Sequence, residues 1–87
     1  MQRAELRKLR QAAARHDAEA ILYLLQRSVK FGHKRLALLR CIQAERMGAT
    51  VAPELLRYCR GVAAHTREDV LHRLMRQACE ELKGAVP

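Results

Sequence analysis

The chain has 87 residues, enough for one domain, and 49% of them are apolar, a share too large for an intrinsically disordered protein. No stretch approaches the ~18 apolar residues that a membrane-spanning helix needs, so we expect no membrane span. Seventeen Lys and Arg against nine acidic residues give a net charge of +8, which favours an acidic partner such as nucleic acid or an acidic protein. We therefore expect residues 1–87 to form a single basic domain.

The first part of the chain predicts either one long helix or two shorter ones. Leu and Ala dominate the sequence and β-branched residues are scarce, a composition that favours helix over strand. Residues 3–15 and residues 18–31 each carry apolar side chains at helical spacing. Asp17 between them is a good N-cap, but no Glu or Gln follows three residues later to complete a capping box, so both possibilities stay open. Gly32 is expected to end this part.

Three further helices are predicted in the rest of the chain. Gly48 closes the first of them, Pro53 suits the first turn of the second, and Thr66 is expected to cap the third. They cover residues 33–47, 53–64 and 66–83. With short links between them, the expected fold is all-α: four to five short helices arranged as stacked antiparallel hairpins or as a small bundle.

The cysteines indicate a reducing environment. Cys41, Cys59 and Cys79 are odd in number and lie about 20 residues apart, whereas a disulfide scaffold of this size has a denser, even-numbered set. We expect them to be small buried apolar side chains. The protein is accordingly predicted to be intracellular, in the cytoplasm or an organelle matrix.

One segment resembles a pentatricopeptide-like helical-hairpin repeat. The resemblance covers residues 21–58 and is carried by Lys30-Phe31-Gly32 at the hairpin turn, Ala37, Gly48, a following proline and Tyr58. It implies paired antiparallel helices and, in that family, contact with RNA. Leu22 and Cys59 stand where the family places its base-reading polar residues, so the resemblance implies a structural hairpin without base-by-base reading.

The positive charge is concentrated in the first half of the chain. Residues 1–40 hold ten basic and three acidic residues, whereas residues 41–87 hold seven and six. A phosphate-binding stripe is predicted from the residues Arg3, Arg7, Lys8, Arg10, Arg27, Lys30, Lys34, Arg35 and Arg40, although a merely solvated basic face is the simpler interpretation. Because the chain has only three aromatic residues, a stacking platform for single strands is not expected. The predicted function is a non-catalytic module that docks on RNA or within a ribonucleoprotein assembly.

An alternative function needs no nucleic acid. Small helical hairpins often hold a partner helix in an apolar groove. Here such a groove would be lined by Leu22, Leu25, Val29, Leu36 and Leu39, although the same side chains also suit an ordinary core. The protein would then be an adaptor or a chaperone-like subunit of a larger complex.

Catalysis is a third and weaker interpretation. Leu9-Arg10, Asp17 and Arg27 resemble the first-helix pattern of the all-helical chorismate mutases, in which two arginines bind a dianionic substrate. Leu38, however, stands where that family has its catalytic lysine, a cation that such chemistry needs. Cys59, His65, His72 and Cys79 lack the close spacing of zinc ligands, and Glu80-Glu81 are expected on a solvated helix face. We therefore expect no catalytic residues, no metal site and no cofactor.

Overall fold

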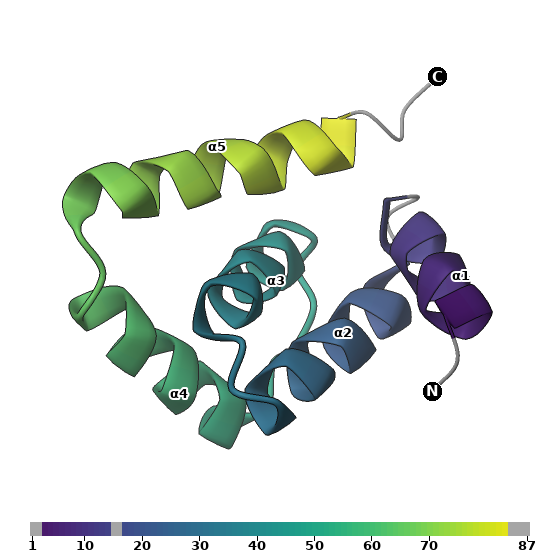
Figure 1. The fold of residues 1–87 in the computed structure, drawn as a ribbon, viewed down its shortest axis with the longest axis horizontal. Helices are drawn as coiled ribbons and strands as arrows, with labels where there is room; N and C mark the ends of the chain where they lie inside the picture. The colour runs from purple at the N-terminus through teal and green to yellow at the C-terminus, as the bar shows by residue number, and fades with distance from the viewer. Residues whose placement is uncertain (1–2, 15–16, 84–87) are drawn as a thin grey trace.

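The all-α prediction is confirmed. The computed structural model describes residues 3–14 and 17–83, without the side chains of residues 12–14 and 83, and these residues contain helices but no strand. Five helices lie within the described ranges: α1 (Arg3–Ala14), α2 (Ala18–Lys30), α3 (Lys34–Arg46), α4 (Pro53–Ala64) and α5 (Glu68–Lys83) (Figure 1).

Asp17 separates α1 from α2 and decides between the two arrangements that the sequence left open. Its backbone is extended (φ −82°, ψ 105°), and its side chain accepts a hydrogen bond from the Ala20 N–H at 3.3 Å. This is the geometry of an N-cap, in which a carboxylate satisfies a free amide of the first turn. Residues 3–31 therefore contain two helices, even though the capping box is incomplete.

Two glycines end α2 and α3 as predicted. Gly32 and Gly48 have φ angles of 70° and 73°, in the left-handed region. Each is followed by a residue whose N–H returns to the preceding helix: His33 donates to the Ser28 carbonyl at 2.8 Å and Ala49 to the Ala44 carbonyl at 3.0 Å. These bonds satisfy carbonyl groups that the helix end leaves unpaired.

The prediction for Thr66 is wrong. Its hydroxyl donates to the Val62 carbonyl at 2.6 Å, inside the last turn of α4, and α5 begins only at Glu68. A hydroxyl that follows a helix by two residues can donate back to a carbonyl of its last turn as readily as it can cap the next helix.

Gly48 and Gly61 allow a matched stability test. An alanine Cβ would meet nothing within 4 Å at either position, so the backbone conformation alone should determine the change in the free energy of unfolding. We expect Gly48→Ala to lower the free energy of unfolding by about 1–2 kcal/mol, because its φ is left-handed. Gly61→Ala, inside α4, is expected to raise it by about 0.5–1 kcal/mol. Urea denaturation followed by circular dichroism measures both, and equal effects of the same sign would contradict this explanation.

Helix α3 lies at the centre of a small bundle. In Figure 1 it is seen almost end-on, with α2 and α4 on one side and α5 on the other. Helices α2, α4 and α5 all contact α3, whereas α4 and α5 diverge from their shared turn. Of the two predicted arrangements, the bundle is therefore observed. Its main apolar core consists of Ala20, Ile21, Leu24, Leu25, Ala37, Leu38, Cys41, Ala44, Val51, Cys59 and Leu82.

The helices also bear on the prediction that the chain does not span a membrane. Among the described residues, no helix combines the length and the apolar character needed to cross a bilayer.

Candidate nucleic-acid interface

Four of the predicted cations gather around the turn that joins α2 to α3. Arg27 and Lys30 occupy the last turn of α2, and Lys34 and Arg35 the first turn of α3. Residues 20–44 contain no acidic residue at all. Among the described residues, none of the four cations forms an ion pair, and all but the half-buried Arg27 are exposed. Their charge is therefore available to an external anion.

Two of the three aromatic side chains lie beside these cations. Tyr23 and Phe31 are 45% and 55% exposed. Their spacing with Arg27, four residues to each side, places all three along one side of α2. The Arg27 guanidinium carbon lies 4.9 Å from the centre of the Phe31 ring, and the Lys30 ammonium lies 5.9 Å from it. We call Tyr23, Arg27, Lys30, Phe31, Lys34 and Arg35 together the turn surface.

Sequence reasoning missed the aromatic part of this surface. It counted the aromatic residues and took their small number as an argument against base stacking. The spacing of Tyr23, Arg27 and Phe31 was a signal that could have been used, because residues four apart lie above one another on a helix. The rings are accessible because of where they lie on α2, and the small number of aromatic residues does not bear on this.

A hollow next to the turn surface brings in side chains from the second half of the chain. It has a volume of about 680 Å³ and is lined by Lys34, Arg35, Tyr58, His65 and Arg67, among others. Arg67 is exposed and bonded to Asp69 at 3.2 Å. His65 and Arg67 lie in the second half of the chain, which supplied none of the predicted anion-binding residues.

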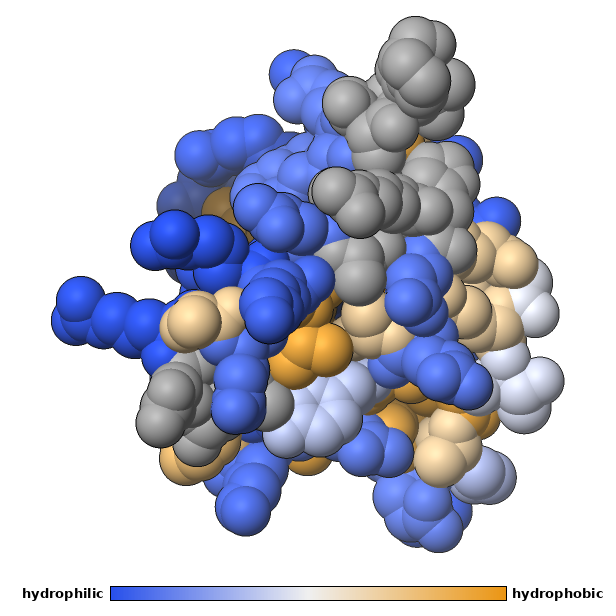
Figure 2. Space-filling model, turned by 90° about the vertical axis from the view of Figure 1, so that its right-hand side faces the viewer, coloured by the Kyte–Doolittle hydropathy of each residue, from blue (hydrophilic) through white to orange (hydrophobic). Residues whose placement is uncertain are grey.

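The cations of α1 form a separate group. Arg3, Arg7, Lys8 and Arg10 are all exposed. Helix α1 lies beside the first half of α2, while the α2–α3 turn lies at the other end of α2 (Figure 1). Figure 2 faces the side of the molecule on which α1 lies and shows hydrophilic side chains over much of the surface. The expected single stripe is therefore two groups of four cations.

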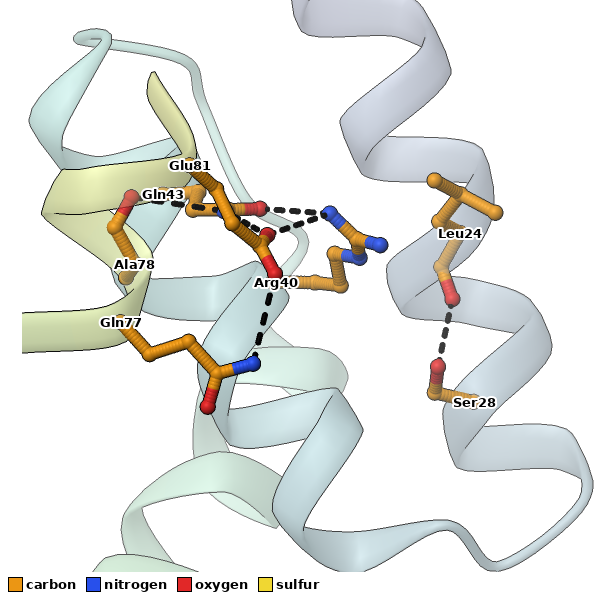
Figure 3. Close-up of polar contacts among 7 residues, drawn as sticks. All are labelled: Leu24, Ser28, Arg40, Gln43, Gln77, Ala78 and Glu81. Atoms are coloured by element: carbon orange, nitrogen blue, oxygen red, sulfur yellow. Dashed lines mark hydrogen bonds and ion pairs between the residues drawn. The ribbon is translucent and has the colours of Figure 1, made fainter. Parts of the chain in front are cut away.

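Arg40 does not belong to either group, which corrects its assignment to the basic surface. Arg40 is only 8% exposed. Its Nη1 donates to Gln43 Oε1 at 2.9 Å and lies 3.5 Å from Glu81 Oε2 (Figure 3). Burial lowers the pKa of Arg40, and the negative charge of Glu81 partly offsets this effect. The Arg40 charge is thus used inside the fold, and no phosphate is needed to balance it.

Gln43 completes this buried polar network between α3 and α5. Its Nε2 donates to Glu81 Oε2 at 2.8 Å and lies 3.5 Å from the Ala78 carbonyl. Gln77 donates to the other Glu81 oxygen at 3.3 Å. Glu81 was expected on a solvated face, but it is only partly exposed, and its carboxylate contacts the three side chains of Arg40, Gln43 and Gln77. The network is structural, and it fixes α5 on α3.

The five side chains predicted to line a partner groove are all buried or half-buried, and two of them, Leu36 and Leu39, line a hollow of about 320 Å³ between α3 and α5. Leu25 and Leu39 are buried to 0% and 2% exposure, and Leu22, Val29 and Leu36 are half-buried. An apolar stripe on a helix is compatible with either core or groove, and here the bundle covers it. An apolar groove of about 570 Å³ occurs between α3, α4 and α5; its walls include Leu38, Cys41, Ile42, Leu56, Cys59, Leu71 and Met75.

The cysteines are free thiols, of which Cys41 and Cys59 are buried and Cys79 is half-buried. The Cys59 thiol lies 3.7 Å from the Ala37 carbonyl. A hydrogen bond between the two buried thiols lowers the pKa of Cys41 and, together with burial, raises the pKa of Cys59. In the described part of the chain, no three His, Cys, Asp or Glu side chains are placed to hold a metal ion.

The positions that suggested a chorismate mutase serve other purposes. Asp17 caps α2, Leu38 lies in the core, and Arg27 lies over the Phe31 ring. The two arginines of the pattern, Arg10 and Arg27, also lie on different helices, α1 and α2. We do not propose this activity.

The hairpin resemblance concerns α2, α3 and the start of α4. The turn at Gly32 joins two helices that contact each other closely, as a hairpin repeat requires. The second pair, α4 and α5, diverges. Membership of the pentatricopeptide family stays a prediction: no known family model matches this chain, and neither a curated protein nor a solved structure matches it.

Proposed function

We propose that this protein is a non-catalytic module that docks on RNA, alone or within a ribonucleoprotein assembly, through the turn surface. The observation that carries the proposal is the group formed by Arg27, Lys30, Lys34 and Arg35, which have no carboxylate partner among the described residues. Cations that the fold does not neutralise are free to replace the counterions of a phosphate backbone. Two of the four are arginines, whose planar guanidinium group suits phosphate.

The expected binding mode is contact with the backbone and not sequence reading. Phosphate contacts position a protein on a nucleic acid and carry no sequence information. Each contact that is lost also reduces the dependence of affinity on salt, by about 0.7 in logarithmic slope for a single strand. The slope of affinity against salt concentration therefore reports the number of phosphate contacts.

Two double variants with the same charge change test this function. Arg27→Gln/Lys30→Gln removes two charges from the turn surface, and Arg57→Gln/Arg76→Gln removes two exposed charges from α4 and α5. We expect the first to weaken RNA binding about tenfold at low salt and to lower the salt slope by about 1–2, and the second to change affinity less than about threefold. Fluorescence anisotropy with a labelled RNA measures both. No RNA binding by the wild-type protein at low salt, or equal losses in the two variants, would refute the proposal.

The groove between α3, α4 and α5 supports a second candidate, a protein adaptor. Its volume of about 570 Å³ and its leucine and methionine walls suit the apolar side of an amphipathic helix. Glu45, Arg46 and Arg60 also line it and could pair with charges on such a helix. A pull-down from native extract with and without nuclease separates the candidates, because an RNA-mediated association is lost after nuclease treatment and an adaptor complex is not.

A further inference from the structure

We infer that the turn surface binds single-stranded RNA in preference to duplex RNA, by stacking an unpaired base on Phe31 with Tyr23 beside it. This inference rests on the proposed function, since it specifies the form of RNA that the same surface takes. Its basis is a hollow along α2 that combines accessible rings, cations and an amide.

The hollow has a size suited to a small planar group. Its volume is about 330 Å³, at the lower end of the roughly 300–1,000 Å³ of small-ligand sites. It is lined by Tyr23, Gln26, Arg27, Lys30 and Phe31. Only three large apolar side chains of the described residues are exposed, and two of them, Tyr23 and Phe31, line this one hollow.

The backbone of Phe31 is hydrogen-bonded, and its ring has charged and aromatic neighbours. Phe31 is the C-cap of α2, and its N–H donates to the Arg27 carbonyl at 3.1 Å. The Arg27 guanidinium lies over the ring, and the His33 ring lies 6.2 Å away at an interplanar angle of 30°. Because a phenylalanine side chain has only two rotatable bonds, a base that stacks on the exposed ring loses little of the stacking energy to ordering of the side chain.

The neighbouring groups match the other parts of a nucleotide. Arg27 and Lys30 lie within 4.9 and 5.9 Å of the ring centre, so a phosphate next to a stacked base has a cation at hand. The Gln26 amide has donors and an acceptor for a base edge. Every base presents a π-face, so such stacking tolerates sequence variation. A duplex keeps its base faces covered and offers only its backbone.

The test compares one ring deletion with two forms of RNA. The full chain and its Phe31→Leu variant are titrated, at one salt concentration, with an unstructured single-stranded RNA and with a duplex of equal length. We expect Phe31→Leu to weaken single-strand binding by roughly five- to 150-fold, the range measured for loss of one base–aromatic stack, and to leave duplex binding within about twofold. Phe31→Tyr keeps the ring and is expected to restore single-strand binding.

Circular dichroism verifies that each variant is folded, which the exposure of Phe31 leads us to expect. Equal losses with both RNAs, or no loss with either, would overturn the stacking inference while leaving backbone docking intact. If the wild-type chain binds neither RNA at low salt, the proposed function fails and the inference fails with it. If Phe31→Tyr binds the single strand as weakly as Phe31→Leu, stacking is also excluded.

Discussion

Leu25→Ala is expected to lower the free energy of unfolding by about 2–5 kcal/mol, because it removes a fully buried side chain and leaves a cavity in the core. A chain of this length has a total stability of roughly 4–13 kcal/mol. The substitution therefore removes a large share of the stability. It acts in the core cluster that α2 shares with α3, α4 and α5.

Leu22→Ala is the matched control for Leu25→Ala. Leu22 belongs to the same helix and has the same size, but it is only half-buried at the edge of the core. We expect its loss to cost less than half as much, since its surroundings can relax and water already reaches it. Urea denaturation of both variants measures the difference. Equal costs would show that Leu25 is not the core residue that its burial indicates.

The comparison also shows how far periodicity alone can predict this fold. Apolar spacing located α4 at both ends, and the two turn glycines ended α2 and α3 as expected. The same spacing could not separate Leu22 from Leu25, because both lie on the apolar side of α2. Which of them is fully buried depends on how the other helices pack around α2, and that is a property of the whole bundle.

The candidate site was predicted in part, for a similar reason. Four cations at the α2–α3 turn were identified from charge alone, and the structure leaves them unpaired within the described ranges. Arg40 looked the same in sequence, yet its partner Glu81 lies 41 residues further along the chain. No local pattern relates two residues so far apart. Conversely, the accessibility of Tyr23 and Phe31 follows from the side of α2 that the bundle leaves open.

Glu81→Gln is expected to destabilise the fold by about 1–3 kcal/mol. Glu81 carries the negative charge that balances the buried Arg40, and its Oε2 accepts from Gln43 at 2.8 Å. Loss of a partner costs about 3–5 kcal/mol when the remaining charge is fully buried. The Glu81 side chain is 37% exposed, so water can compensate in part and a smaller effect is expected.

Glu80→Gln provides the control, because it changes the net charge equally at an exposed neighbouring position. It is expected to alter stability by less than about 0.5 kcal/mol. Arg40→Met introduced into the Glu81→Gln background should then cost less than it does in the wild-type chain, because the unbalanced charge has been removed. Chemical denaturation of the four variants completes this cycle. The charge of Arg40 holds α5 against α3, so Arg40→Met should lower the free energy of unfolding while the folded protein binds RNA as the wild type does. Normal stability together with a loss of RNA binding would instead show that Arg40 contacts RNA.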